Sequence, residues 1–240
     1  GSVTIQTPDS VRKFIQDPVS QQFTRASGND GTLSLQGQSY RLLETTGEVL
    51  MFRPDGKLDY EEIPGGLRTI LSYTGSQVTA ITDVDGNVTL IEYNAQGRVS
   101  RTVARNGVAA TYSYDPSGER LIDINDSSGT TQFSYVTGQG SAREHALASI
   151  TFPDGTHLYF SYDGQGRLIQ QQRDGQAETV TYFYDADGAI TTTDANGAQS
   201  SVLVGELGIR YKVTGNRDQI SRLNYVAAGN LARLVGPEGG

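Results

Sequence analysis

The chain has 240 residues, no cysteine and a net charge of −8 at pH 7. The lack of cysteine excludes a disulfide framework and a thiolate metal site, and the negative charge argues against nucleic acid as a partner, because nucleic acid requires a basic surface. No run of about 18 apolar residues is present, so membrane insertion is not expected. The 29 glycines and the many Thr, Ser, Gln, Asp and Asn residues are typical of short strands joined by turns, and they predict an all-β protein.

Residues 1–37 differ from the rest of the chain and are predicted to form a small N-terminal cap and lead-in. Asp9 or Ser10 is a suitable first residue for one short helix, which would include the apolar residues Val11, Phe14 and Ile15. The stretch "ASGNDGTLS" then indicates a loop before the first strand. We expect this segment to cover the N-terminal end of the sheet, because an open sheet edge pairs readily with other chains.

Residues 38–240 contain an internal repeat of about 21 residues. Each unit ends a strand-like run with an aromatic residue, and in six of eight units a glycine follows four positions later. A tight hairpin turn explains this glycine, because glycine adopts the left-handed conformation without a Cβ clash. The six pairs are Phe52 and Gly56, Tyr93 and Gly97, Tyr114 and Gly118, Tyr162 and Gly166, Tyr184 and Gly188, and Tyr225 and Gly229.

A second turn signal lies halfway along each unit, as in Asp85-Gly86, Asn106-Gly107 and Asp174-Gly175. Such dipeptides are strong signals for a two-residue hairpin turn. Each unit therefore contains two strands and two turns, and the chain reverses direction about every 11 residues. The repeats predict tandem antiparallel β-hairpins that form one continuous ribbon, twisted or spiralling like a solenoid.

Alternation within the strands separates two kinds of side chain. In "ETVTYFYD", Val180, Tyr182 and Tyr184 share one face, whereas Thr181 and Phe183 share the other. The tyrosine face would be a sugar-stacking platform if exposed and a core ladder if covered, and we favour the ladder because a large exposed aromatic face promotes aggregation. Phe183, an aromatic residue on the hydroxyl-rich face, is the candidate binding residue.

Arginine outnumbers lysine by 16 to 3. Arginine binds carboxylates through a planar fork and stacks on aromatic rings, so this bias suits a ladder of side chains on a sheet. Plain compositional bias explains it equally well.

No catalytic residue, metal site or cofactor is predicted. The stretches "DVDGN", "DADG" and "DANG" lack the full ligand set of a calcium loop, and turn formation explains their aspartates. The two histidines, His145 and His157, cannot build a three-histidine zinc site, and no G-x-S-x-G nucleophile elbow is present. Two carboxylates brought together by folding would leave glycoside hydrolysis open, and the long irregular loop "VTGQGSAREHALAS" at 136–149 is where catalysis would best fit.

The stretches "YNAQGRVS", "YDPSGERL" and "YDGQGRLI" closely resemble the tyrosine-aspartate (YD) repeat of the Rhs family, the teneurins and the cocoon-forming components of insecticidal toxin complexes. In that family the repeats form a long β-ribbon that spirals into a hollow shell around a toxic polypeptide, or they support adhesion at cell surfaces. This sequence has eight to nine repeats, fewer than such shells use, and lacks the "DPxGL" region that ends a typical shell. It therefore resembles a piece of a longer protein or a short, open array.

The resemblance implies a non-enzymatic structural or encapsulating scaffold of a bacterial exported protein, located outside the cell or at its surface. The expected partners are neighbouring domains of the parent chain and an encapsulated polypeptide. The alternative is a carbohydrate-binding or adhesion module of a secreted multidomain protein, with a glycan as its partner.

Overall fold

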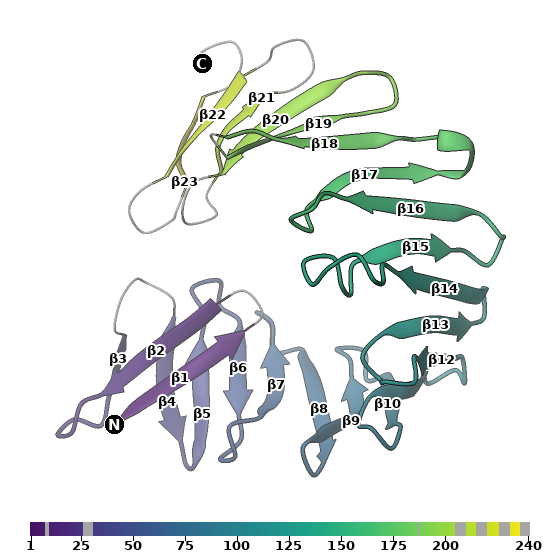
Figure 1. The fold of residues 1–240 in the computed structure, drawn as a ribbon. Helices are drawn as coiled ribbons and strands as arrows, with labels where there is room; N and C mark the ends of the chain where they lie inside the picture. The colour runs from purple at the N-terminus through teal and green to yellow at the C-terminus, as the bar shows by residue number, and fades with distance from the viewer. Residues whose placement is uncertain are drawn as a thin grey trace. The chain divides into compact units, whose positions relative to one another are not determined.

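The computed structural model describes residues 1–7, 10–25, 31–186, 188–204, 210–214, 220–225 and 231–235 of the chain. Within this part nearly every element is a β-strand (Figure 1), and the exception is the three-residue 3-10 helix η1 (Asp174–Gln176). No helix in the described part is long and apolar enough to cross a membrane. The predicted all-β class is confirmed.

The chain divides into two compact units, residues 1–111 and 112–240. The first unit contains a small antiparallel sheet with the strand order β1–β2–β3, and the strands of a long antiparallel sheet start at β4. The last strand of this unit, β12, continues into the second unit. The strands are β1 (Ser2–Thr7), β2 (Ser10–Gln16), β3 (Phe23–Arg25), β4 (Thr32–Gln36), β5 (Ser39–Leu43), β6 (Val49–Phe52), β7 (Leu58–Glu62), β8 (Arg68–Thr74), β9 (Gln77–Thr82), β10 (Val88–Tyr93), β11 (Val99–Val103) and β12 (Ala109–Tyr114).

In the second unit, from β13 to β23, each strand pairs antiparallel with the strand that follows it in the chain. This succession confirms the predicted ribbon of tandem β-hairpins. The strands are β13 (Leu121–Asp126), β14 (Gly129–Tyr135), β15 (Leu147–Thr151), β16 (His157–Tyr162), β17 (Leu168–Arg173), β18 (Val180–Tyr184), β19 (Ala189–Thr193), β20 (Gln199–Val204), β21 (Arg210–Thr214), β22 (Ile220–Tyr225) and β23 (Leu231–Val235).

In five repeats of the described part, the turn that follows the aromatic residue is closed by a glycine in the left-handed conformation. After Tyr162, the N–H of Gly166 donates to the carbonyl of Asp163 (3.0 Å), and the N–H of Asp163 donates to the carbonyl of Arg167 (3.0 Å). Gly166 has a φ of +80°, which a residue with a Cβ adopts only under strain. The other repeat glycines with positive φ are Gly56, Gly97, Gly118 and Gly188. Gly229 lies outside the described residues, and for Tyr225 the backbone alone is described, as the end of β22.

The halfway turns mostly share this geometry and differ from the predicted two-residue loop. In one of them the N–H of Asp83 donates to the carbonyl of Asn87 (2.9 Å) and the N–H of Gly86 donates to the carbonyl of Asp83 (3.0 Å). The carboxylate of Asp83 also accepts the N–H groups of Asp85 (2.9 Å) and Asn87 (2.8 Å). An aspartate at the first position thus gives the longer turn extra hydrogen bonds, which a two-residue loop would not provide.

The short helix predicted near the N-terminus is wrong. Of its two candidate first residues, Asp9 lies outside the described residues and Ser10 begins strand β2. Side chains alternate along this strand as in any sheet, because Phe14 is 1% exposed and Val11 is 67% exposed. Arg12 shares the buried side with Phe14, so a charged residue occupies a core-facing position and hides the alternation in the sequence.

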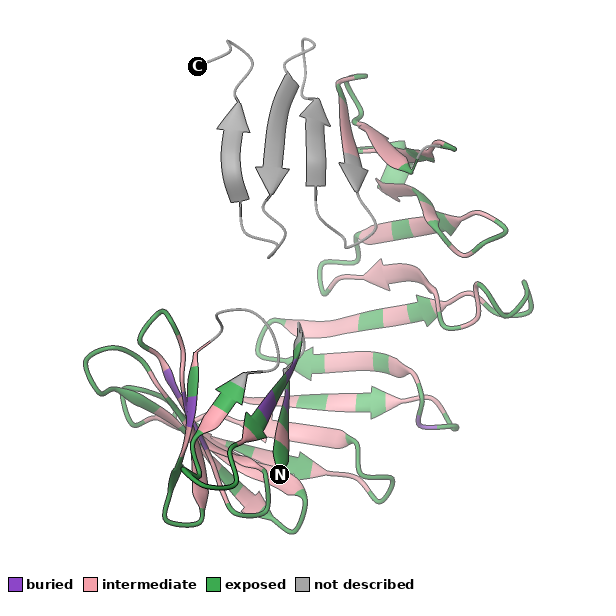
Figure 2. Cartoon of the chain, turned by 90° about the vertical axis from the view of Figure 1, so that its left-hand side faces the viewer, coloured by how far each residue is buried: buried purple, intermediate pink, exposed green. Residues whose placement is uncertain are grey.

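The small sheet packs on one face of the first strands of the long sheet. Ile5 and Phe14 form a buried cluster with Leu33 of β4 and Leu42 of β5, and Phe52 of β6 packs against this cluster. Figure 2 shows most of the buried residues in this part of the chain, whereas the residues of the later described strands are intermediate or exposed. The N-terminal segment is therefore a second layer on the face of the long sheet that carries the repeat aromatic Phe52.

Candidate functional site

A ladder of tyrosine hydroxyl groups joins successive repeats. Each of these hydroxyl groups donates to a backbone carbonyl near the start of the strand that follows the turn or loop after the preceding repeat aromatic. A buried or half-buried tyrosine hydroxyl requires such a partner, and a carbonyl fixes the direction of the ring. The bonds are Tyr73 to Leu58 (2.7 Å), Tyr93 to Val78 (2.8 Å), Tyr135 to Leu121 (2.8 Å), Tyr162 to Leu147 (2.9 Å) and Tyr184 to Leu168 (2.9 Å).

Cationic side chains from the preceding turn lie over several of these rings. The guanidinium carbon of Arg167 is 4.4 Å from the ring centroid of Tyr184, and Arg167 Nε also binds Asp163 Oδ2 (2.7 Å). A cation over an aromatic ring at an exposed site contributes about 0.5–1 kcal/mol. The other pairs are Arg120 over Tyr135 at 5.8 Å, and Arg53 and Lys57 over Tyr73 at 5.3 Å and 5.4 Å. The arginine bias thus has a structural use in the ladder.

The aspartate after the repeat tyrosine holds the turn through its carboxylate. Asp163 Oδ1 accepts the N–H groups of Gln165 (2.9 Å) and Arg167 (3.0 Å). The pKa of Asp163 is lowered, and the hydrogen bond from the backbone N–H of Arg167 is the largest cause. In the turn after Tyr93, Asn94 Oδ1 takes the same place and accepts two backbone N–H groups. The requirement is therefore an oxygen acceptor at this position, which either residue supplies.

These turn bonds also bear on the calcium-like stretches. The carboxylate of Asp83 in "DVDGN" accepts two turn N–H groups, and the carboxylate of Asp194 in "DANG" accepts those of Asn196 (2.9 Å) and Ala198 (2.8 Å). Within the described part of the chain, no group of three or more His, Asp or Glu side chains is placed to hold a metal ion. The absence of a metal or cofactor stays a prediction.

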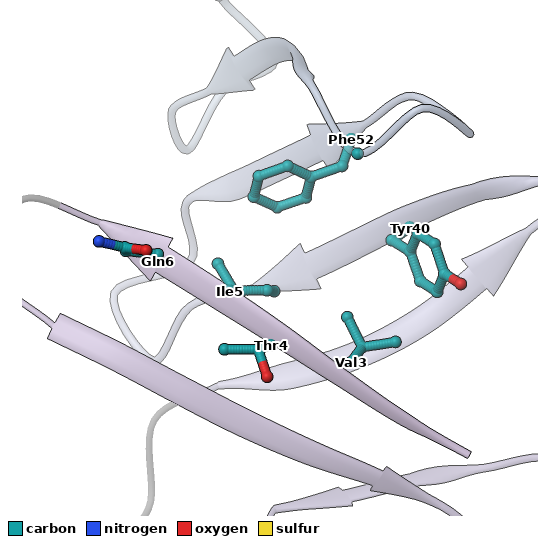
Figure 3. Close-up of a pocket in the computed structure, with 7 residues that line it drawn as sticks. Val3, Thr4, Ile5, Gln6, Tyr40 and Phe52 are labelled. Atoms are coloured by element: carbon teal, nitrogen blue, oxygen red, sulfur yellow. The ribbon is translucent and has the colours of Figure 1, made fainter.

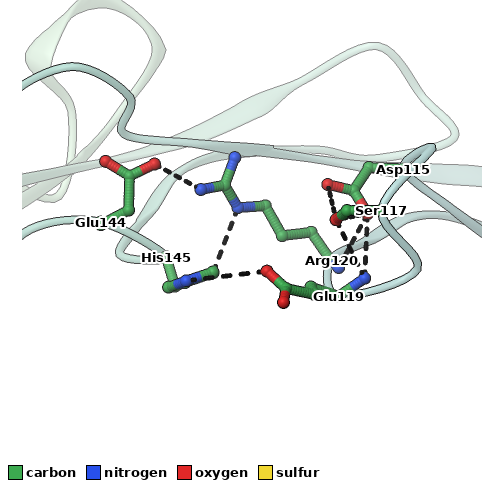
Figure 4. A network of polar contacts seen from close by, with 6 residues as sticks. All are labelled: Asp115, Ser117, Glu119, Arg120, Glu144 and His145. Atoms are coloured by element: carbon green, nitrogen blue, oxygen red, sulfur yellow. Dashed lines mark hydrogen bonds and ion pairs between the residues drawn. The ribbon is translucent and has the colours of Figure 1, made fainter.

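The long loop that was the best place for catalysis is fastened to the glycine turn beside it (Figure 4). Arg120 Nη2 donates to Glu144 Oε1 (2.6 Å), and Arg120 Nε donates to Nδ1 of His145 (3.3 Å). The N–H of Val136 donates to the carbonyl of Ala146 (2.8 Å) and closes the loop at its base. His145 Nδ1 therefore accepts a hydrogen bond. Glu144 and His145 of this loop hold Arg120, whose guanidinium group lies over the ring of the ladder residue Tyr135.

The two faces of the second unit carry different chemistry, as the alternation predicts. We name the side with the repeat aromatics the aromatic face, comprising Phe133, Tyr135, Leu158, Phe160, Tyr162, Val180, Tyr182 and Tyr184, all half-buried. We name the opposite side the hydroxyl face, comprising Tyr159, Ser161, Gln170, Gln172, Thr181, Phe183, Thr191 and Thr193, which the strand register places in adjoining rows.

Phe183 is the most exposed aromatic side chain of the hydroxyl face. It is 66% exposed, lies opposite Thr191 on β19, and is two residues from Thr181 on its own strand. Tyr159 on β16 is a second exposed aromatic of this face. Nothing in the fold requires an aromatic residue at position 183, because its ring is not part of the ladder or of the buried cluster.

The second histidine lies at the end of this face. His157 Nδ1 is 3.1 Å from Asp174 Oδ1, and the N–H of His157 donates to Asp174 Oδ2 (2.7 Å). That backbone bond is the main cause that lowers the pKa of Asp174. The ring of His157 stacks on Tyr159 with 5.5 Å between the centroids. The structure thus places His145 and His157 in separate polar contacts of neighbouring turns and does not bring them together.

The repeats correspond to a known family. The RHS repeat model matches residues 93–131 and 162–199, and both segments begin at a ladder tyrosine. These two segments are therefore similar to RHS repeats. The match confirms the resemblance drawn from the turns.

Parts of two larger proteins are also similar to this chain. The tRNA3(Ser)-specific nuclease WapA of Bacillus spizizenii is 30% identical over 122 residues, which cover 48% of this chain and 5% of that protein. The double-stranded DNA deaminase toxin A of Burkholderia cenocepacia is 28% identical over 162 residues, which cover 60% of this chain and 11% of that protein. The chain therefore matches a small part of either relative. The crystal structure of TcdB2-TccC3 aligns with a TM-score of 0.45 at 12% identity, over 95% of this chain and 18% of that one.

Sequence reasoning found the repeated residues of the RHS array but missed how they connect. The period and the turn chemistry are local and visible in the sequence. The acceptor of each tyrosine hydroxyl is a backbone carbonyl. Every residue has such a group, so the sequence does not identify the acceptor. A signal was nevertheless present, because an apolar residue follows the turn at each acceptor position, as at Leu58, Leu121 and Leu168.

We predict that removing one ladder hydroxyl weakens the array. Tyr184→Phe should lower the free energy of unfolding by about 0.5–1.5 kcal/mol, because the carbonyl of Leu168 loses its donor. Tyr182→Phe is the matched control, since the hydroxyl of Tyr182 has no partner among the residues that the structure describes, and it should change the value by less than about 0.5 kcal/mol. Urea unfolding followed by circular dichroism measures both. Equal effects of the two substitutions would contradict the ladder.

A second prediction concerns the contact between the long loop and the glycine turn. A Cβ added at Gly166 would collide with the carbonyl of Ala142 in this loop, whereas one at Gly97 would meet the side chain of Gln77 at 3.6 Å. Both residues have positive φ, so alanine at either site costs about 1–2 kcal/mol. Gly166→Ala should additionally release the loop and speed tryptic cleavage after Arg143, whereas Gly97→Ala should not. Equal cleavage rates in the two variants would rule out this packing.

Proposed function

We propose that this chain is a structural scaffold, without catalytic activity of its own, that packs a polypeptide against its aromatic face. The observation that carries the proposal is the small N-terminal sheet. Its residues Ile5 and Phe14 pack on the long sheet at Leu33 and Leu42, on the face of the first unit that carries the repeat aromatic Phe52. In the first unit, a polypeptide segment thus already covers the face that carries a repeat aromatic. This packing supports the proposal that the aromatic face of the second unit binds polypeptide.

The chemistry of the two faces supports the same proposal. Apolar and aromatic side chains line the aromatic face, and their contact with a polypeptide would remove apolar surface from water at about 25 cal/mol per Å². Ladder hydroxyl groups are already bonded to carbonyls, so they need no further partner on contact. The hydroxyl face, in contrast, is rich in groups that remain hydrated at little cost.

The similar proteins suggest the kind of larger protein to which this chain belongs. They are named as a nuclease and as a deaminase toxin, and this chain matches a small part of each. We therefore propose that the chain is part of a larger, exported bacterial toxin, that it acts outside the cell or at its surface, and that the enzymatic activity of that toxin belongs to other domains. The partners would be those neighbouring domains, with no role for nucleic acid binding by this chain.

The polypeptide proposal predicts that the aromatic face binds an unfolded chain. The probe is reduced and carboxymethylated α-lactalbumin, and binding is followed by fluorescence anisotropy of the labelled probe. Val180→Lys places a charge on the aromatic face and should weaken binding at least about tenfold, because burial of an unpaired ammonium group is costly. Thr181→Lys, the next residue on the hydroxyl face, is the matched control and should bind normally. If Thr181→Lys loses binding and Val180→Lys does not, the polypeptide binds the hydroxyl face, and the proposal is contradicted.

A second candidate function is carbohydrate binding on the hydroxyl face, as in an adhesion module. The observation that favours it is the exposure of Phe183 beside hydroxyl and amide side chains. An exposed ring can stack on the apolar side of a sugar while the neighbouring groups bind its hydroxyl groups.

This candidate predicts that Phe183→Ala abolishes glycan binding on a glycan array. The matched control is Ile169→Ala on the adjacent strand β17, also an exposed apolar residue, which should leave binding intact. Circular dichroism should show that both variants keep the fold. Glycan binding that survives Phe183→Ala would remove this residue from the site.

A further inference from the structure

The outer edge of strand β1 has free backbone hydrogen-bonding groups. Among the described strands, β1 pairs with β2 alone, and the N–H of Gln16 donates to the carbonyl of Gly1 (2.9 Å). Bonded and non-bonded pairs alternate along antiparallel strands, so Val3 and Ile5 exchange bonds with β2. The N–H and C=O groups of Thr4 and Gln6 therefore point to the opposite edge of the sheet.

This edge lacks the features that normally prevent a strand from pairing. Protein edges are usually short, charged, bulged or interrupted by proline. Residues 2–7 are "SVTIQT", with no charge and no proline, and the register with β2 runs without a bulge. The other edge of the same sheet, β3, is three residues long and contains Arg25. The sheet thus has one protected edge and one edge that is suited to accept a strand.

A pocket of about 290 Å³ lies beside the open edge (Figure 3). Val3 and Ile5 line one side, and Tyr40 of β5 and Phe52 of β6 line the other. The pocket also reaches Gly56 in the turn of the first repeat. Its volume is at the lower limit for a small-molecule site, about 300–1,000 Å³, and suits a few side chains of a strand better than a large ligand.

We propose that an extended polypeptide segment with apolar side chains at alternate positions adds to the edge of β1 as a fourth strand of the small sheet. Its backbone would pair with Thr4 and Gln6, and its apolar side chains would enter the pocket at Tyr40 and Phe52. This mode of binding gives affinity through backbone hydrogen bonds and selectivity through pockets for alternate side chains. The inference rests on the proposed function and names one place where a polypeptide would bind the chain.

Continuity with the existing interface supports this occupant. The sheet of β1–β3 already packs Ile5 and Phe14 against Leu33 and Leu42, with Phe52 at the margin of the cluster. A strand added beside β1 would cover Phe52 and extend the same apolar contact along the long sheet. A second copy of this chain fits the pocket less well, because the apolar residues of its own β1, Val3 and Ile5, are already packed in or against the buried cluster of that copy.

The test uses the full chain and a fluorescent seven-residue peptide that alternates valine and threonine between terminal lysines. Binding is measured by anisotropy with two further peptides, each N-methylated at alternate positions. One methylation pattern removes the N–H groups that face β1 and should abolish binding, whereas the other pattern should leave it nearly unchanged. Equal binding by both methylated peptides, or no binding of the parent peptide, would overturn the proposal.

Two protein variants complete the test. Gln6→Pro removes an outward N–H without disturbing the pairing with β2, which is where edge strands tolerate proline, and it should weaken peptide binding about tenfold. Gln6→Val keeps the N–H and should bind normally, and circular dichroism checks that both variants fold. A concentration-dependent dimer that Gln6→Pro abolishes, without peptide binding, would identify a second copy as the occupant and would contradict the proposal.

The result separates this inference from the proposed function. Val180→Lys lies in the second unit and should not change peptide binding at β1. If the unfolded probe binds the aromatic face while the peptide ignores Gln6→Pro, the edge proposal fails alone. If the unfolded probe does not bind at all, the proposed function fails, whatever the peptide does.

Discussion

The hydrogen bond from each ladder tyrosine to the carbonyl after the preceding turn is the interaction that organises the array. A β-ribbon with one aromatic face requires an interaction that fixes the strand register, because a slip of one residue would exchange its two faces. The aromatic residue ends a strand, and in several repeats the register shifts at that position, as between Ser161 and Tyr162. The hydroxyl then reaches the carbonyl of Leu147 in the preceding repeat. Each repeat is thus tied to its neighbour by a bond that forms in one register alone.

The ladder also explains why the turn residues are so restricted. Asp163 holds the turn through backbone N–H groups, Gly166 provides the left-handed conformation, and Arg167 covers the ring of Tyr184. Three residues of one turn therefore serve two repeats. The long loop at 136–146 interrupts the spacing without breaking the ladder, because Tyr162 still finds the carbonyl of Leu147 where the loop returns to the sheet.

The secondary structure of the repeat region could be predicted from the sequence because local interactions determine it. That of the N-terminal region could not, because it depends on contacts between residues far apart in the chain. The turn after Tyr162 is specified by five adjacent residues, so its geometry and the two-faced strands beside it could be predicted. Strand β2 could not, because its buried side consists of Arg12 and Phe14 and its exposed side includes Val11. Arg12 can occupy a core-facing position because Glu44, 32 residues later, binds its guanidinium group at 2.8 Å. No pattern within residues 10–16 contains that information, and the exposed valine favoured the wrong period.

The same reasoning separates structural from functional residues in this chain. On the aromatic face every ladder tyrosine has a partner in the fold, so its presence is explained without a ligand. On the hydroxyl face a small polar side chain would serve the strand at position 183 as well as phenylalanine does, since β-strands accept either and burial does not decide. At β1 the fold would equally tolerate a lysine at position 4 or 6, which would protect the edge. Phe183 and the uncharged edge of β1 are therefore features that the ladder does not require, and for this reason they are the places at which we propose contact with a partner.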